Sequence, residues 1–328
     1  MQHRTLGRTG RDVSIIGLGT WQLGADWGDV SEADAHAVLD ASAASGVTFF
    51  DTADVYGDGR SEALIGQWRR SNPDADLTVA TKMGRRMEQI PSNYVLENFR
   101  AWTDRSRRNL GVDTLDLVQL HCPPTAVYSD DAVFDALDTL VEDGVVAAYG
   151  VSVETQAEAL AAIARPGVAT VQIILNAFRL KPLDEVLPAA LDAGVGVIAR
   201  VPLASGLLSG RYTRDTAFAP DDHRTFNRHG EAFDQGETFS GVDFDEGVDA
   251  AREFSALAAS AGLAPATAAL AWVAQLPGVS SVIPGARNVA QAESNAAAGS
   301  VAELGEDFTA TVKEIYDRRF RAAIHSRW

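Results

Sequence analysis

Short apolar runs alternate with amphipathic stretches along almost the whole chain. Apolar runs of strand length predict eight strands, at 16–20, 47–51, 77–82, 116–121, 145–151, 169–174, 195–200 and 280–283. The stretches between them have helical spacing and predict helices near 31–45, 59–71, 92–110, 130–143, 154–164, 184–193, 246–261 with 265–276, and 288–297. Eight such strand–helix units are typical of a closed parallel barrel. We therefore expect the α/β class, with residues 1–328 forming a single (β/α)₈ TIM barrel domain.

Two segments outside this repeat extend the expected barrel. Residues 3–14 (HRTLGRTGRDVS) have the turn chemistry of a β-hairpin, which we expect to plug the bottom of the barrel. Residues 305–324 predict one more helix as a C-terminal extension. Two further segments are long loops: residues 83–93 directly follow Lys82, and residues 211–244 show no stable spacing of apolar residues. Long loops after barrel strands usually face the active site, so these two are expected to do so.

Composition and net charge argue against some classes of binding partner. The chain is 46% hydrophobic and 22% charged, which suits a large core, and its net charge of −17 opposes binding to nucleic acid or to an anionic membrane. The N-terminus lacks the apolar region of a secretory signal, and no run of about 18 apolar residues is present. We expect a cytoplasmic protein. Cys122 is the only cysteine, which excludes an intrachain disulfide, and we interpret it as a small buried residue.

Four ionisable residues lie at or just past the ends of predicted strands. Asp51 ends VTFFD, Tyr56 follows five residues later, Lys82 ends LTVATK and His121 ends LDLVQLH. Each alone could be structural, but parallel strands bring their carboxyl ends to one face of a barrel. An ammonium favours the ionised form of a phenol, a carboxylate can hold that ammonium, and a neutral imidazole can bind a substrate oxygen. Together they predict protonation of a carbonyl oxygen while a hydride reaches its carbon.

At these residues the sequence resembles the aldo-keto reductase family, and the resemblance covers nearly the whole chain. The matching stretches, in the family's order, are GLGTW (17–21), FDTADVYGDGRSEALIG (50–66), VATKMG (79–84), LDLVQLH (115–121), GVS (150–152), PLASGLLSGRY (202–212) and IPGARNVAQAESN (283–295). The resemblance implies that Tyr56 is the general acid in carbonyl reduction, Lys82 tunes its pKa, Asp51 holds Lys82 and His121 orients the carbonyl. It also implies NADPH as the cofactor.

The expected cofactor site lies after the seventh and eighth strands. No GxGxxG opens a helix after the first strand, which argues against a Rossmann domain. PLASGLLSGRY offers glycines, hydroxyls and Arg211, and Arg287 lies next to a helix start, which favours phosphate. The resemblance implies that Arg287 clamps the 2′-phosphate. The full set expected to contact the cofactor is Gly19, Thr20, Ser152, Gln172, Arg200, Pro202, Leu203, Ser205, Gly206, Leu208, Gly210, Arg211, Gly285, Arg287, Gln291 and Asn295.

The chain departs from the family pattern at three positions. Val153 stands where the family generally has Asn, and Ser294 replaces a frequent Glu near the adenine. Arg200 stands where an aromatic side chain commonly stacks on the nicotinamide. A planar guanidinium can also stack on a ring, or it can pair with an acidic residue at the barrel rim, and both interpretations stay open.

The walls of the substrate pocket are the least specific prediction. Trp21, Trp27 and Met83 are expected to line it. His223 and His229 have no spacing typical of metal ligands, so we expect no metal and interpret them as parts of a solvated loop. The sequence thus predicts NADPH-dependent reduction of a small aldehyde or ketone. A non-catalytic, cofactor-binding regulatory subunit on the same barrel is the alternative, and the physiological substrate and oligomeric state stay open.

Overall fold

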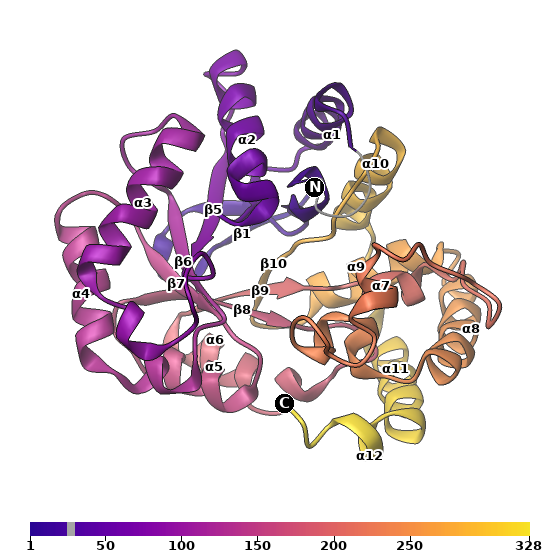
Figure 1. Ribbon diagram of the computed structural model, residues 1–328. Coiled ribbons are helices and arrows are strands. Elements are labelled where there is room, and N and C mark those ends of the chain that lie inside the picture. Colours follow the sequence, from indigo (N-terminus) through magenta and orange to yellow (C-terminus); the bar gives the residue numbers. More distant parts are fainter. Residues whose placement is uncertain (25–29) are drawn as a thin grey trace.

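The computed structural model describes residues 1–24 and 30–328, and its centre is a parallel barrel (Figure 1). The strands follow one another around the barrel in chain order. They are β3 (Leu18–Gly19), β4 (Phe49–Asp51), β5 (Thr78–Met83), β6 (Leu117–His121), β7 (Tyr149–Ser152), β8 (Val168–Ile174), β9 (Gly196–Arg200) and β10 (Val279–Val282). Parallel bridges from Ile16 to Val282 and from Gly19 to Gly285 join the first strand to the last. The predicted (β/α)₈ barrel is confirmed.

Helices surround the strands, as the alternating pattern predicts (Figure 1). They are α1 (Glu32–Ala44), α2 (Arg60–Ser71), α3 (Leu96–Leu110), α4 (Asp131–Glu142), α5 (Gln156–Ile163), α6 (Val186–Ala193), α7 (His223–Phe226), α8 (Phe244–Ser260), α9 (Pro265–Gln275) and α10 (Val289–Ala297). The expected cap forms at α1, where the Ser31 hydroxyl accepts a hydrogen bond from the Asp34 amide at 3.1 Å. Pro265 occupies the first turn of α9.

The N-terminal hairpin closes the bottom of the barrel. Strand β1 (His3–Thr5) pairs antiparallel with β2 (Asp12–Ser14). Leu6 and Val13 are fully buried and pack in one cluster with residues of the barrel interior, among them Phe49, Leu117 and Ile198. The predicted plug is therefore confirmed, and its apolar side chains fill the end of the barrel opposite the carboxyl ends of the strands.

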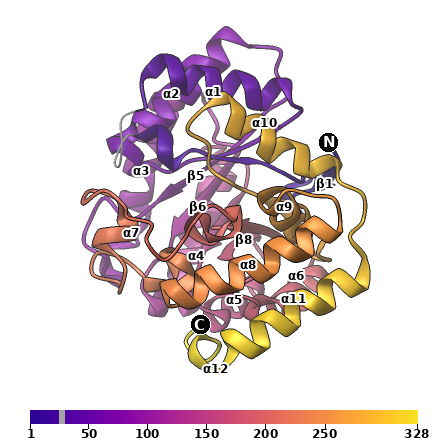
Figure 2. The same cartoon turned by 90° about the vertical axis from the view of Figure 1, so that its right-hand side faces the viewer.

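The C-terminal extension differs from the prediction. Residues 305–324 form two helices, α11 (Gly305–Arg319) and α12 (Arg321–Ile324), instead of one. Phe320 leaves the helical conformation and is buried, with its ring 4.9 Å from that of Phe178. Burial of this ring interrupts the helix and turns α12 along the edge of the molecule (Figure 2). Elsewhere in the described chain, the predicted strand 145–151 is regular only from Tyr149.

Short 3-10 helices make up much of the remaining described chain. They are η1 (Gly7–Thr9), η2 (Trp21–Gly24), η3 (Tyr56–Gly59), η4 (Pro91–Asn93), η5 (Thr125–Ser129), η6 (Lys181–Leu183), η7 (Ala204–Ser209), η8 (Gln235–Glu237), η9 (Phe239–Gly241) and η10 (Ala298–Ser300). Among the described residues, no single helix is long and apolar enough to cross a bilayer. Only α8 and α9 pass by length and composition, as a pair bent by 82°.

Candidate active site

The barrel brings the four predicted catalytic residues together. Lys82 Nζ lies 2.5 Å from Asp51 Oδ1, 2.9 Å from the Thr52 carbonyl oxygen and 3.5 Å from the Tyr56 hydroxyl. The rings of Tyr56 and His121 meet edge to face, with centroids 6.0 Å apart. Adjacent strands β4, β5 and β6 carry Asp51, Lys82 and His121, and η3 begins at Tyr56. The register of parallel strands therefore produces this cluster from residues that lie far apart in sequence.

Two glutamines complete the environment of the buried carboxylate. Asp51 Oδ2 accepts hydrogen bonds from Gln172 Nε2 at 2.8 Å and from Gln119 Nε2 at 3.3 Å. A buried ion pair is stable only when its remaining polar atoms are also satisfied. Gln119 was not predicted as a site residue, although a polar residue inside the apolar run LDLVQLH marks it. Gln172 also lines the cavity, so its expected contact with a cofactor amide stays a prediction.

Burial and charge determine which of these groups are neutral. Burial lowers the pKa of Lys82, but attraction to Asp51 and then Tyr56 outweighs it, so the net pKa lies above the usual value. Burial raises the pKa of the Tyr56 phenol, and Lys82 only partly offsets this. The ammonium favours the ionised phenol, as expected, but desolvation is the larger effect and the net pKa of Tyr56 lies above its usual value. Tyr56 is therefore protonated at neutral pH and can donate that proton.

His121 is held in its neutral form. Burial lowers its pKa well below the usual value, and the charges of Arg85, Lys82 and Arg200 lower it further. Its Nδ1 atom is buried and has no hydrogen-bond partner among the described residues. A neutral imidazole beside a protonated phenol can bind and polarise a carbonyl oxygen, as the sequence predicts.

A cavity of about 900 Å³ extends from these residues to the start of α10. Asp51, Tyr56 and His121 are among the residues that line it. Most residues expected to contact a cofactor also line it: Gly19, Thr20, Ser152, Gln172, Arg200, Pro202, Leu203, Ser205, Gly206, Arg211, Gly285, Arg287, Gln291 and Asn295. The cavity thus joins the candidate catalytic groups to the candidate phosphate site.

Two expected cofactor residues do not line the cavity. The Leu208 side chain is fully buried in the hydrophobic core. Gly210 adopts a left-handed φ of 71°, and a Cβ there would lie 2.8 Å from Ser255 Oγ. Its role in the structure is a tight turn packed against α8 and α9.

Two residues of the expected phosphate site, Ser205 and Gln291, already make hydrogen bonds within the protein. The Ser205 hydroxyl donates to the Glu237 carbonyl oxygen at 3.0 Å and accepts from the Phe239 amide at 2.9 Å, so it ties η7 to the long loop. Gln291 Oε1 accepts from the Arg287 amide at 2.8 Å, and the Gln291 amide donates to the N-cap residue Asn288 at 2.9 Å. The start of α10 is thus ordered beside the cavity.

Aromatic residues form the wall next to Tyr56. Trp21 lines the cavity as predicted, with its ring 6.2 Å from Tyr56, 5.5 Å from His223 and 6.0 Å from Phe233 between centroids. His223 and Phe233 come from the long loop and were not predicted, because nothing local marks which loop residues turn inward. His223 is buried rather than solvated, and burial lowers its pKa to about 4.

The structure does not place the other two predicted pocket residues, Met83 and Trp27, in the cavity wall. Met83 is 1% exposed and lies in the hydrophobic core, outside the cavity wall. Side chains alternate along β5, so Met83 faces away from the side that carries Lys82. Trp27 lies outside the described residues.

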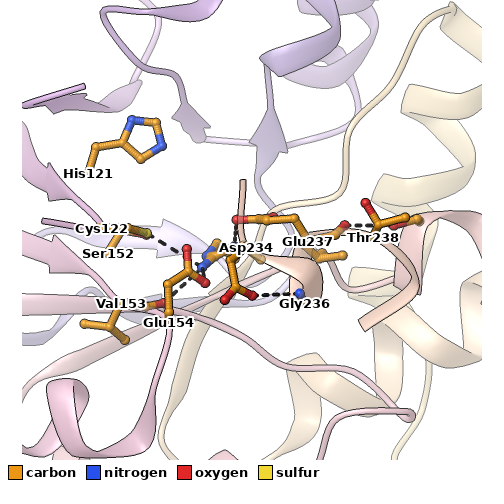
Figure 3. A network of polar contacts seen from close by, with 12 residues as sticks. His121, Cys122, Ser152, Val153, Glu154, Asp234, Gly236, Glu237 and Thr238 are labelled. Carbon is orange, nitrogen blue, oxygen red and sulfur yellow. Dashed lines mark hydrogen bonds and ion pairs between the residues drawn. The ribbon is translucent and has the colours of Figure 1, made fainter. Parts of the chain in front are cut away.

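Arg200 makes the ion pairs that one of its two interpretations predicts. Its two partners, Glu154 and Glu237, are labelled in Figure 3. The Arg200 Nη2 atom lies 2.9 Å from Glu154 Oε2 and donates to the Val153 carbonyl oxygen at 3.0 Å, and Nη1 pairs with Glu237. Burial opposes its charge, but Glu237 and Glu154 outweigh burial and raise its pKa. Arg200 thus joins the loop after β7 to residues 211–244. It also lines the cavity, so stacking on a cofactor ring stays a prediction.

The lone thiol has no catalytic character. Burial raises the pKa of Cys122 to about 12, and its Sγ lies 3.3 Å from the Ser152 hydroxyl. Cys122 is half-buried, so the expected burial of this residue is only partly met. In the described parts of the chain, no three His, Cys, Asp or Glu side chains are grouped to hold a metal ion.

Comparison with known proteins agrees with this geometry. The model of the aldo/keto reductase family matches residues 15–317. An aldo-keto reductase from Strobilurus tenacellus is 32% identical over 317 residues, 92% of this chain and 89% of the relative. A probable voltage-gated potassium channel subunit beta from Oryza sativa is 31% identical over 327 residues, 93% of each chain. The solved glycerol dehydrogenase from Gluconobacter oxydans has a TM-score of 0.78 and 29% identity, covering 94% of this chain and 93% of that one. The chain therefore belongs to the aldo/keto reductase family of oxidoreductases.

Proposed function

We propose that the protein reduces aldehydes or ketones to alcohols with NADPH, and that Tyr56 donates the proton. The observation that carries this proposal is the contact of Lys82 Nζ with both Asp51 and the Tyr56 hydroxyl, at 2.5 and 3.5 Å, beside a neutral His121. A protonated phenol beside a neutral imidazole supports the proposal, because such a pair can deliver a proton to a bound carbonyl oxygen.

The residues of the cavity fit a phosphorylated dinucleotide. The cavity has a volume of about 900 Å³, which lies within the range of small-molecule and cofactor sites. Arg211 and Arg287 line the cavity, and the start of α10 adds backbone amides that favour anions. Arg287 would hold the 2′-phosphate, and Ser152 and Gln172 would face the nicotinamide amide. NADPH, when bound, supplies the hydride.

The chain's own groups account for the proton transfer. The neutral His121 imidazole donates a hydrogen bond that orients the carbonyl, and the phenol proton moves from Tyr56 Oη to the carbonyl oxygen. The nearby Lys82 ammonium stabilises the phenolate that results, and Asp51 keeps Lys82 charged. Solvent then returns a proton to Tyr56. In the reverse direction the phenolate acts as the base.

The substitution Tyr56→Phe tests this role. It removes the donor while keeping the ring, so turnover of a simple aldehyde, followed by loss of NADPH absorbance, should fall at least ~10²-fold. NADPH affinity, measured by fluorescence titration, should barely change. Tyr94→Phe is the matched control, because the Tyr94 hydroxyl is buried without a partner among the described residues and lies outside the cavity wall. Retention of most activity in Tyr56→Phe would refute the assignment.

A regulatory subunit is the second candidate, because potassium channel beta subunits are among the relatives. On this alternative the barrel binds a cofactor and acts through a partner surface. The close grouping of the four candidate catalytic residues, Asp51, Tyr56, Lys82 and His121, favours an enzyme. If the wild-type protein binds NADPH but turns over no aldehyde, ketone or sugar in a broad screen, the regulatory alternative is supported.

A further inference from the structure

Arg85 and Arg86 are neighbours in sequence but lie in different environments. Both follow β5 after Gly84, whose φ of 118° is a conformation that only glycine adopts readily. A Cβ at Gly84 would press on the Tyr94 hydroxyl at 3.0 Å. Beyond this turn, Arg86 pairs with the exposed Asp58, while Arg85 lines the cavity. The turn therefore separates one surface cation from one cation that faces the active site.

A single hydrogen bond joins Arg85 to the main chain of the candidate catalytic histidine. Its Nε donates to the His121 carbonyl oxygen at 3.1 Å. Its Nη2 atom is 3.7 Å from Glu154 Oε1, which is too long for a hydrogen bond. In the described structure, neither Nη atom of Arg85 has a hydrogen-bond acceptor, and 29% of the side chain is exposed. The Nη atoms of Arg85 thus keep hydrogen-bond capacity for a ligand in the cavity that this residue lines.

Two other arginines that line the cavity already have carboxylate partners. Arg200 pairs with both Glu154 and Glu237. Arg224 pairs with Asp222 through two contacts, Nε to Oδ1 at 2.8 Å and Nη2 to Oδ2 at 2.5 Å. Since both glutamates are held by Arg200, Arg85 keeps only its long contact with Glu154. After burial, the largest influences on the His121 pKa are the positive charges of Arg85, Lys82 and Arg200.

We propose that Arg85 binds a carboxylate of the substrate, an inference that rests on the proposed reaction. The preferred substrates are then aldehydes or ketones that carry a carboxylate a few bonds from the carbonyl. A guanidinium fork matches a carboxylate in two parallel hydrogen bonds, which adds geometric selection to charge attraction. His121 orients the carbonyl and Arg85, bonded to the main chain of His121, holds the other end. Arg85 is thus a specificity-determining residue of the same site.

The test compares two substrates that differ only in charge. Para-carboxybenzaldehyde and para-carbamoylbenzaldehyde have nearly the same shape, and succinic semialdehyde with its amide forms an aliphatic pair. In the wild type, kcat/KM for the carboxylate should exceed that for the amide by about ten- to a hundredfold, the range of charged hydrogen bonds, mainly through KM. In Arg85→Gln this ratio should collapse toward one, and in Arg85→Lys it should be partly restored. Arg86→Gln is the matched control and should keep the wild-type ratio.

The outcomes separate this inference from the proposed function. A wild-type ratio near one, or an unchanged ratio in Arg85→Gln with both rates lowered together, overturns carboxylate recognition while carbonyl reduction stands. If no aldehyde is reduced, the proposed function fails. Calorimetric binding of para-toluate against para-toluamide then decides the inference without turnover: preference for the toluate, lost in Arg85→Gln and kept in Arg86→Gln, supports it, and equal binding overturns it.

Discussion

Desolvation, more than any single charge, determines the protonation states of the active-site residues. Burial raises the pKa of Tyr56 and of Cys122 and lowers that of His121, so all three are neutral at neutral pH. Lys82 keeps its charge because the Asp51 carboxylate lies 2.5 Å away. The charged Lys82–Asp51 pair therefore lies next to a neutral phenol, and a neutral imidazole lies beside that phenol. This combination suits proton transfer to a carbonyl oxygen.

At this scale we predict that Arg287→Ala separates the two nicotinamide cofactors. Arg287 lines the cavity at the start of α10, and only NADPH carries the 2′-phosphate that a guanidinium can hold. Hydrogen bonds to charged groups contribute about 1.5–3 kcal/mol, so NADPH affinity should fall about ten- to a hundredfold and NADH affinity much less. Dissociation constants for both cofactors check this. Arg252→Ala on the exposed face of α8 is the control, and equal weakening of both cofactors would mean that Arg287 supports the adenosine end or the fold.

At the scale of elements, the C-terminus holds part of the long loop in place. The Trp328 indole donates to Asp234 at 3.2 Å, and its ring lies 4.0 Å from the Arg179 guanidinium. A Cβ at Gly241 would meet the same ring at 2.3 Å. Glu237 lies between Asp234 and Gly241 in sequence and close to Asp234 in space (Figure 3), and it pairs with Arg200 at the end of β9. The last residue of the chain thus supports the segment that faces the active site.

We predict that Trp328→Ala loosens residues 234–241. Loss of the indole removes the hydrogen bond to Asp234 and the packing on Arg179, so amide hydrogen exchange in this segment should become faster while that of the barrel strands does not. Exchange followed by mass spectrometry provides the measurement. Leu191→Ala is the control, because this leucine is also apolar but 61% exposed on α6. Unchanged exchange at 234–241 would show that the other contacts of this segment, among them the Arg200–Glu237 pair and the hydrogen bonds of Ser205, are enough to order it.

At the scale of the whole molecule, Asp54 makes stability depend on pH. Asp54 is fully buried, and neither carboxylate oxygen has a hydrogen-bond partner among the described residues. Burial, then Glu62, raises its pKa to about 7, although Arg86 and Arg105 oppose this. Between the ordinary carboxyl pKa and about 7, the folded protein binds a proton that the unfolded chain has lost. Stability therefore falls as the pH rises through this window, and the loss persists above it.

We predict that Asp54→Asn removes this loss. The gain in unfolding free energy over the wild type should be small near pH 4, grow toward about pH 7 and then stay constant at a few kcal/mol. Thermal unfolding at about pH 5 and about pH 8 measures it, with the difference between variant and wild type cancelling the other ionisations. Asp58→Asn is the control, since Asp58 is exposed and paired with Arg86 and Arg105, which lower its pKa. A constant difference between the two pH values would contradict the role of Asp54.

Sequence alone determined the barrel and the positions of its four catalytic candidates. Strands and helices follow from the spacing of apolar residues, and parallel strands necessarily place Asp51, Lys82 and His121 at the same end. The plug and most of the cavity-lining residues were predictable for the same reason, because each lies at a regular position next to an element with a clear pattern.

Only the tertiary structure decided which loop residues reach the site and which groups are charged there. Nothing periodic in residues 211–244 distinguishes His223 and Glu237, which face the cavity, from their exposed neighbours. The burial of Met83, the two partners of Arg200 and the remaining hydrogen-bond capacity of Arg85 likewise depend on segments distant in sequence. Local spacing encodes the regular elements, whereas desolvation and pairing of charges depend on all the groups that surround a side chain in space.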